Sequence, residues 1–289
     1  MPHTKQQLKD LLTAAGVRPR HKWGQNFLID LNLMRMLVRA AALQGNETIL
    51  EVGCGTGSMT ALLAEGGGAV VAVDVDRTLA EIAERELELY DNVAVVCNDV
   101  LAGKNAIAPS VREAVRRSRA EAGGEFCLIA NLPYQAASPL IVNLLLEKDE
   151  GLTPDGMFVT VQAEVAERMA AEPGTKAYGL LSILMQAIGE VRRLRVVKPQ
   201  AFWPQPKVNS AMIAWRRDPE RCAEVKDMVA LKKTVDLLLR HRRKKIKTCL
   251  AGHRGGEKLA EVLDTLAIDP NGRGETLSVQ QYVQLSNLA

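Results

Sequence analysis

Aromatic residues are scarce in this sequence, and long apolar runs are missing. Phe, Trp and Tyr make up 4% of the 289 residues, so the core must be built mainly from aliphatic side chains and Met. No run of about 18 apolar residues occurs, which argues against a transmembrane helix. The opening segment MPHTKQQLKDLL lacks the apolar stretch of a signal peptide. We therefore expect a cytoplasmic protein that does not contact membranes.

Cysteine is also sparse and unpatterned. The five cysteines are far apart in the sequence, and no two of them form a C-x-x-C pair. An odd, scattered set of this kind is typical of reduced thiols in a reducing compartment. We expect neither a disulfide framework nor a metal site.

Acidic and basic residues are unevenly distributed along the chain. Residues 1–186 carry 17 Lys and Arg against 23 Asp and Glu, whereas residues 187–289 carry 20 against 11. The acidic N-terminal part favours a site for a small molecule or a cation, and the basic C-terminal part favours a surface that binds a polyanion.

The hydrophobic pattern divides the chain into two domains. Up to residue 218, short Val- and Ile-rich runs alternate with helical patterns, which predicts a doubly wound α/β sheet. Residues 219–289 have helical periodicity alone, which predicts a smaller all-α domain. Residues 102–125 contain a basic helical pattern over Val111–Ala122, and we interpret this stretch as an exposed surface insertion. The predicted strands are Thr48–Gly53, Ala69–Val75, Val93–Cys97, Phe126–Ala130, Met157–Gln162 and Val208–Trp215.

A glycine-rich segment, EVGCGTGSMT, follows the first of these strands. Gly53, Gly55 and Gly57 permit a tight turn and let a ligand lie against bare backbone. Asp74, at the end of the next strand, is placed to accept hydrogen bonds from the ribose of an adenosine cofactor. NAD and S-adenosylmethionine both fit this layout. Glu51 and the G-x-G-x-G spacing favour S-adenosylmethionine, because the NAD fingerprint requires Gly where Ser58 stands.

Two further polar segments come at strand ends that should meet at the same sheet edge. Asp99 can accept from the amino group of the cofactor's adenine, or it can cap a helix. The tetrad Asn131-Leu132-Pro133-Tyr134 can be a plain turn. It can also hold an adenine base, with the Asn131 oxygen and the Leu132 carbonyl accepting the two amino hydrogens, Pro133 stiffening the backbone and Tyr134 stacking on the ring.

Together these motifs resemble the ribosomal RNA adenine dimethyltransferase family, most closely its bacterial small-subunit branch associated with kasugamycin sensitivity. The resemblance runs from about His21 to the C-terminus. Its segments are HKWGQNFLID, EVGCGTGSMT, VDVD, NDV, NLPY, QAEVAERM, KAYGLLSI, AFWPQPKVNSAMI, HRRKKIKTCL and GETLSVQQY. It implies a Rossmann-like methyltransferase domain over residues 1–218 that uses S-adenosyl-L-methionine, followed by a helical RNA-binding domain over residues 219–289.

The resemblance also implies site residues and a product. Phe202 would pair with Tyr134 to sandwich the flipped adenine. The product would be dimethyladenosine at two adjacent adenosines in a hairpin near the 3′ end of 16S rRNA. Asp74 is more often Glu in relatives, and Asn209 also fits the branch that methylates large-subunit RNA and confers macrolide resistance. Cofactor contacts are implied for Asn26, Leu28, Gly53, Asp74, Asp99 and Asn131, in addition to Gly55 from the glycine loop.

The segment RHRRKKIK, from residue 240 to residue 247, concentrates positive charge in the second domain. It can be a solvated helix face or a phosphate-binding surface. The resemblance favours phosphate contacts, and the partner would be 16S rRNA or the pre-30S subunit, bound by a monomer. The residues concerned are Arg240, Arg242, Arg243, Lys244, Lys245 and Lys247.

Overall fold

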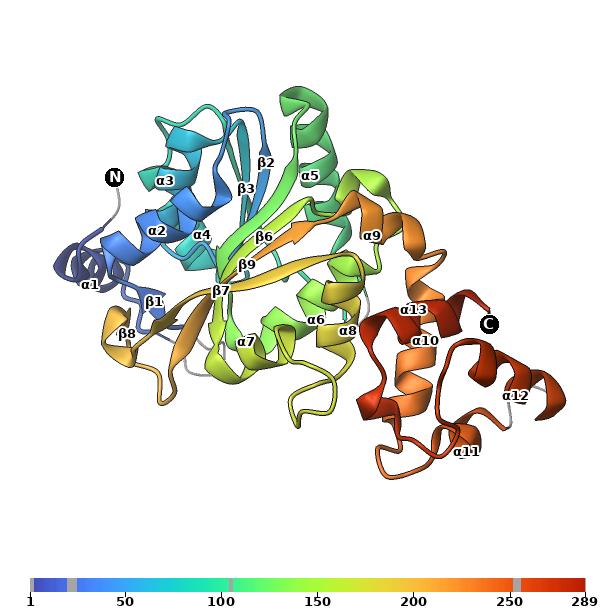
Figure 1. Cartoon of the computed structure of the whole chain (residues 1–289). Helices are drawn as coiled ribbons and strands as arrows, with labels where there is room; N and C mark the ends of the chain where they lie inside the picture. Colours follow the sequence, from blue (N-terminus) through green and yellow to red (C-terminus); the bar gives the residue numbers. More distant parts are fainter. Residues whose placement is uncertain (1–2, 20–24, 104–105, 252–255, 289) are drawn as a thin grey trace. The chain divides into compact units, whose positions relative to one another are not determined.

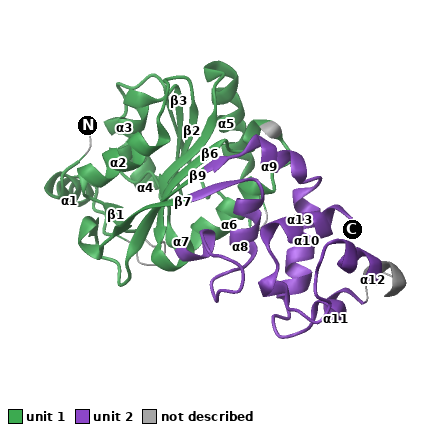
Figure 2. Cartoon of the chain, in the orientation of Figure 1, with its two compact units in different colours: residues 1–166, 192–215 green, residues 167–191, 216–289 purple. Residues whose placement is uncertain are grey.

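The computed structural model describes residues 3–19, 25–103, 106–251 and 256–288. Contacts divide the chain into two compact units, coloured separately in Figure 2. Unit 1 comprises Met1–Ala166 and Arg192–Trp215, and unit 2 comprises Glu167–Val191 and Arg216–Ala289. The last change of unit, between Trp215 and Arg216, lies close to the boundary predicted after residue 218, but residues 167–191 also join unit 2. The reason is that α8 (Leu180–Ala187) packs against α10 (Met228–Leu239) and α13 (Val279–Asn287).

A seven-stranded sheet with the order β4-β3-β2-β5-β6-β9-β7 forms the centre of unit 1 (Figure 1). Its first five strands run parallel, with β2 between β3 and β5. Every residue of β2 and β3 is buried, as expected for apolar strands covered on both faces. This confirms the predicted α/β sheet. The strands are β2 (Thr48–Val52), β3 (Ala69–Asp74), β4 (Val93–Cys97), β5 (Phe126–Asn131), β6 (Gly156–Gln162), β7 (Gly189–Val197) and β9 (Ser210–Arg217).

A small ribbon lies beside the sheet. It consists of β1 (Phe27–Leu28) and β8 (Phe202–Trp203), which pair antiparallel so that Leu28 faces Phe202. Just past β1, the Ile29 amide donates to the Ala201 carbonyl at 2.8 Å, which extends the contact.

Helices cover both sides of the sheet, with α2 and α3 on one side and α5 on the other (Figure 1). The helices that begin in unit 1 are α1 (Lys5–Ala14), α2 (Leu31–Ala41), α3 (Ser58–Gly66), α4 (Arg77–Glu86), α5 (Pro109–Ala122), α6 (Tyr134–Leu145) and α7 (Ala163–Met169), with 3-10 turns η2 (Glu150–Leu152) and η3 (Pro199–Ala201). No helix among the described residues is long and apolar enough to cross a membrane.

The helix predicted within residues 102–125 is present as α5, but it is the packed crossover helix between β4 and β5 and not an exposed surface insertion. Val111, Ala114, Val115 and Ser118 of α5 are buried at the i, i+3, i+4 and i+7 spacing. They pack on β2, β3 and β4. The arginines of the opposite face are largely neutralised, since Arg112 pairs with Glu147, Arg116 with Asp149, and Arg119 with Asp155. The high charge of α5 hid its apolar stripe in the sequence.

Unit 2 is mainly helical, and the described part of residues 219–289 contains no extended strand, as predicted. Leu231, Val235 and Leu238 of α10 form its buried core with Tyr282 of α13. The Tyr282 hydroxyl donates to the Gly274 carbonyl at 2.9 Å. The remaining helices are α9 (Pro219–Glu224), α11 (Ile246–Leu250), α12 (Gly256–Thr265) and the 3-10 turn η4 (Gly274–Thr276).

Candidate active site

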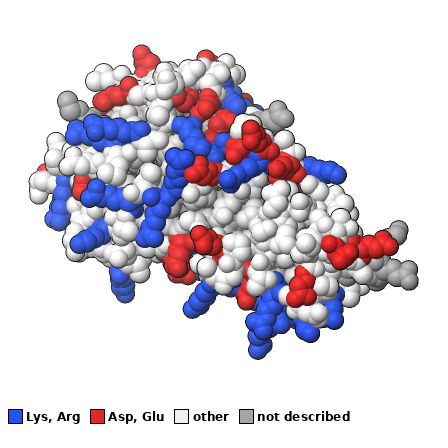
Figure 3. Space-filling model, viewed as in Figure 1, with Lys and Arg blue, Asp and Glu red and all other residues white. Residues whose placement is uncertain are grey.

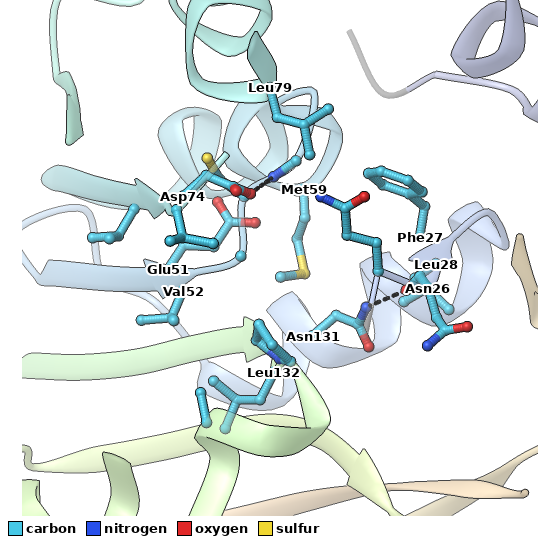
Figure 4. Close-up of a pocket in the computed structure, with 18 of the residues that line it drawn as sticks. Asn26, Phe27, Leu28, Glu51, Val52, Met59, Asp74, Leu79, Asn131 and Leu132 are labelled. Carbon is cyan, nitrogen blue, oxygen red and sulfur yellow. Dashed lines mark hydrogen bonds between the residues drawn. The ribbon is translucent and has the colours of Figure 1, made fainter. Parts of the chain in front are cut away.

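A cavity of about 300 Å³ opens in unit 1 at the carboxyl ends of β2, β3, β4 and β5. Ligands bind at this edge in open α/β sheets. The loop after β2 forms one part of its wall, and the tetrad after β5 forms another (Figure 4). Ten residues predicted from the sequence line it: Asn26, Leu28, Gly53, Gly55, Asp74, Asp99, Asn131, Leu132, Pro133 and Tyr134.

The glycine loop has a backbone that other residues rarely adopt. Gly53, Gly55 and Gly57 have φ angles of 79°, 59° and 83°. A Cβ on Gly53 would lie 2.9 Å from Pro133 Cγ, and one on Gly55 would lie 2.9 Å from the Phe27 ring. The loop is therefore both left-handed and closely packed, which leaves bare backbone at the cavity wall.

Asp74 lies at the end of β3 and is 7% exposed. One carboxylate oxygen accepts from the Gly55 amide and the other from the Asp76 amide, both at 2.9 Å. Burial raises the pKa of Asp74 to about 6, and the amide bonds oppose this rise. Because each carboxylate oxygen can accept a second hydrogen bond, the group is oriented for a donor in the cavity.

Glu51 brings a second buried carboxyl group to the cavity, from β2. It is 2% exposed, and its Oε2 has no hydrogen-bond partner among the described residues. Burial raises the pKa of Glu51 to about 8, and the nearby charge of Asp74 adds to the rise. An uncompensated buried carboxyl group at a cavity suits a cationic ligand.

Asn131 lies across the cavity from the two carboxyl groups, at the end of β5 (Figure 4). Its amide nitrogen donates to the Asn26 carbonyl at 3.0 Å. Its Oδ1 is shielded from solvent and has no partner among the described residues. The bond to Asn26 fixes the orientation of the amide, so that an acceptor is left for an incoming donor.

Tyr134 is the first residue of α6, directly after Pro133. Its hydroxyl lies 2.9 Å from the Ser210 hydroxyl of β9. Burial raises the pKa of Tyr134, so the phenol stays neutral at physiological pH. The bond to Ser210 holds the ring in one orientation at the cavity.

Phe202 does not line the cavity, which differs from the predicted sandwich with Tyr134. It is 1% exposed and packs in the core with Leu28 and Met34. Successive strand residues point to opposite sides, so Trp203 points away from this core and stacks on Phe27, with ring centroids 6.5 Å apart. Contact between Phe202 and a base stays a prediction that requires this ring to be uncovered.

Asp99 lines the cavity from the loop after β4 and remains exposed. Its Oδ1 accepts from the Leu101 amide at 2.9 Å, so the carboxylate shapes its own loop. Sequence reasoning missed His3, which also lines the cavity. The His3 ring bonds Glu86 through Nε2 and Ser58 through Nδ1, both at 2.9 Å. A single His near the start of the sequence carries no signal of such long-range contacts.

The basic segment of unit 2 is a turn between α10 and α11, not a continuous helix, because α10 ends at Leu239. Arg242 donates to the Tyr178 carbonyl at 2.6 Å and pairs with Glu275 at 3.1 Å. The guanidinium thus contacts residues within unit 2, while 40% of the side chain remains exposed, and its contact with RNA stays a prediction. The other five cations, Arg240, Arg243, Lys244, Lys245 and Lys247, are exposed.

Comparison with known proteins identifies the family. The model of the ribosomal RNA adenine dimethylases matches residues 16–289. The chain belongs to this family. "Ribosomal RNA small subunit methyltransferase A" of Bacillus thuringiensis (strain Al Hakam) is 36% identical, covering 98% of this chain and 96% of that protein. The protein of the same name from Bacillus mycoides (strain KBAB4) matches equally well.

Solved structures agree in fold. A dimethyladenosine transferase from Plasmodium falciparum has a TM-score of 0.72 at 20% identity, covering 89% of this chain and 94% of that one. The 23S rRNA methyltransferase ErmE has a TM-score of 0.63 at 22% identity, covering 91% and 98%. At these identities the likeness shows a shared Rossmann-like architecture.

The cofactor of this methyltransferase is S-adenosyl-L-methionine, and the cavity fits it. Asp74 offers acceptors for ribose hydroxyls, and the unpartnered Oε2 of Glu51 suits a molecule that carries sulfonium and ammonium charges. The glycine loop, which a Cβ would fill, lets such a molecule lie against the backbone.

Proposed function

We propose that this protein dimethylates the exocyclic amino groups of two adjacent adenosines in the 3′-terminal hairpin of 16S rRNA during small-subunit assembly. The observation that carries the chemistry is the buried Oδ1 of Asn131, which has no partner among the described residues and lies at the wall of the cofactor cavity. An amino group is the donor that would satisfy it.

The tetrad supplies what an adenine amino group needs to react. That nitrogen is a weak nucleophile because its lone pair is delocalised into the ring. Asn131 Oδ1 and the Leu132 carbonyl each accept one amino hydrogen, which directs the lone pair into the cavity and stabilises the positive charge that the nitrogen gains. S-adenosyl-L-methionine, when bound, supplies an electrophilic methyl group. The amino proton leaves after transfer, so no general base is needed.

Tyr134 holds the base in this scheme. A flipped adenine stacks on its ring, which is fixed through the Ser210 hydroxyl. This scheme assigns no proton transfer to the phenol, whose pKa is raised by burial.

The small-subunit target is supported by the relatives at 36% identity, which match this chain almost end to end and carry that specificity in their names. The large-subunit alternative is supported by Asn209 and by the fold of ErmE alone. We propose that the protein acts as a monomer in the cytoplasm, on 16S rRNA or the pre-30S subunit. The exposed cations of residues 240–247 other than Arg242 would contact phosphates.

The test uses ribosomal subunits that lack the modification. Purified protein and methyl-labelled cofactor are incubated with such 30S subunits, with 50S subunits and with naked 16S rRNA, and the digested RNA is analysed by mass spectrometry. We expect dimethyladenosine in small-subunit RNA and none with Asn131→Ala. Labelling confined to 23S rRNA would assign the protein to the large-subunit branch. The absence of labelled bases from every RNA would refute the proposed function.

A further inference from the structure

The positive charge of the second part of the chain lies mostly outside the C-terminal helices. Residues 187–217 hold seven Lys and Arg against one acidic residue, whereas residues 218–289 hold 13 against 10. Most of this basic excess therefore falls on β7, β8, β9 and the loops between them. Residues 192–215 of this stretch, which hold five of the seven cations, belong to unit 1, the unit that contains the cavity.

β7 carries the densest part of this charge, in the sequence GEVRRLRVV. It is the last strand in the sheet order, and its residues from Arg192 to Val196 are all exposed. Arg193 and Arg195 alternate with Leu194, so both arginines lie on the same face of the strand, about 7 Å apart along it. Val197, two residues further on that face, is buried against α2.

Arg195 borders a hollow between β7 and the start of α2. Asn32 of α2 and Gln200 offer amide groups there, while Lys198 adds a second exposed cation. Arg35 and Arg39 of α2 are also exposed, one and two helical turns after Asn32. Figure 3 shows Lys and Arg gathered over the face of unit 1 that α2 and β7 form.

The arginines of this face are not neutralised by the protein itself. Neither Arg193 nor Arg195 makes a hydrogen bond or an ion pair with any residue that the structure describes. This contrasts with α5, where Arg112, Arg116 and Arg119 all pair with acids. Within the hollow, Asp30 is the acidic residue, and its Oδ1 is engaged in capping α2. Arg195 and Lys198 outnumber this one carboxylate, so the lining of the hollow carries a net positive charge.

We propose that this β7 face, defined by Arg193, Arg195 and Lys198, is a phosphate-binding surface that holds the RNA backbone beside the catalytic cavity. The proposal rests on the proposed function, because RNA is the polyanion that the reaction requires. The β1–β8 ribbon joins the two regions: Asn26 and Leu28 line the cavity, whereas Ile29 and Ala201 line the hollow. Phosphate contacts here would set the position of the flipped base relative to Asn131.

A competing explanation is that the charges only protect an edge strand from pairing with another chain. The two roles respond differently to the sign of the charge. Edge protection requires a charged side chain of either sign, whereas phosphate binding requires a cation. Replacing both arginines by Glu separates them.

The experiment measures RNA affinity against salt concentration with the full chain and a fluorescent transcript of the 3′ part of 16S rRNA. For Arg193→Gln with Arg195→Gln, we expect the slope of log K against log[salt] to be shallower by about 1.4–1.8, so that between about 50 and 200 mM salt the parent loses about tenfold more affinity than the variant. The Glu pair should bind more weakly still and remain monomeric. The matched control is Arg85→Gln with Arg117→Gln, two exposed arginines on α4 and α5, which should keep the parent slope.

Cofactor affinity should be unchanged in all these variants, which shows that the fold is intact. A Gln pair with the parent's salt slope, or a Glu pair with the parent's affinity, would overturn the proposal while leaving the methyltransferase function standing. A parent that methylates no RNA would instead overturn the proposed function, and the surface with it.

Discussion

Replacing Asn131 by Ala tests the chemistry most directly. The variant removes the unpartnered Oδ1 and also the donor to the Asn26 carbonyl at 3.0 Å. Loss of one net hydrogen bond costs about 0.5–1.5 kcal/mol of folding free energy, which the protein should survive. The acceptor matters more in the transition state, where the amino nitrogen becomes cationic. We therefore expect the methyl-transfer rate to fall by about 10²–10³-fold, which corresponds to about 3–4 kcal/mol.

The assay is single-turnover methylation with saturating cofactor and pre-bound RNA, so that binding defects do not enter the rate. A thermal melt of the same preparation reports the cost to folding. Tyr134→Phe, which keeps the neighbouring ring, is the matched control. A rate for Asn131→Ala within about tenfold of the parent, in a folded protein, would show that Oδ1 does not stabilise the transition state.

Four further outcomes are expected. Asp74 accepts best when ionised, and its pKa is about 6, so cofactor affinity should be retained above that pH and fall by up to about tenfold between pH 7 and pH 5 in calorimetry. Asp74→Asn should bind the cofactor more weakly and should not show this fall in affinity with pH. If the variant has the same pH profile of cofactor binding as the parent, Asp74 does not bind the cofactor. Tyr134→Phe should keep most single-turnover activity, because it loses only the Ser210 bond, worth about 1 kcal/mol; inactivity would give the hydroxyl a chemical role. His3→Ala should weaken cofactor binding severalfold by releasing the segment before α1 from the glycine loop, and equal affinities would show that its contacts do not reach the cofactor. Arg242→Gln should lower the melting temperature and leave the salt slope of RNA binding unaltered, whereas a shallower slope with an unchanged melt would make it a phosphate contact.

Local patterns were sufficient to predict the residues that follow strands. Gly53, Asp74 and Asn131 each come directly at the end of a buried apolar run, and parallel strands bring such ends to one edge. The same logic could not find His3, whose position depends on contacts 55 to 83 residues away in the sequence.

The features that the sequence does not predict have a common physical cause: the charge and apolarity of one segment do not reveal which distant segments pack against it. The sequence predicts the helix of α5 but not its buried face, because that face consists of only four residues, most of them small, among many charged ones. The sequence does not predict β7, because residues 192–196 of this edge strand are exposed on both faces. An exposed strand needs no alternation of apolar and polar residues. The contacts of Arg242 with Glu275 and with the Tyr178 carbonyl likewise join segments far apart in the sequence, so its own segment does not reveal them.

The contact between Gly53 and Pro133 limits how this enzyme can be redesigned. A Cβ on Gly53 would lie 2.9 Å from Pro133 Cγ, so the loop that we expect to bind the methyl donor is closely packed against the tetrad that we propose holds the acceptor base. Retargeting the protein to another nucleobase by exchanging the tetrad would therefore disturb donor binding as well. Laboratory evolution of the glycine loop or of the tetrad should therefore select paired substitutions at Gly53 and Pro133. Single substitutions at either position should be rare among active clones.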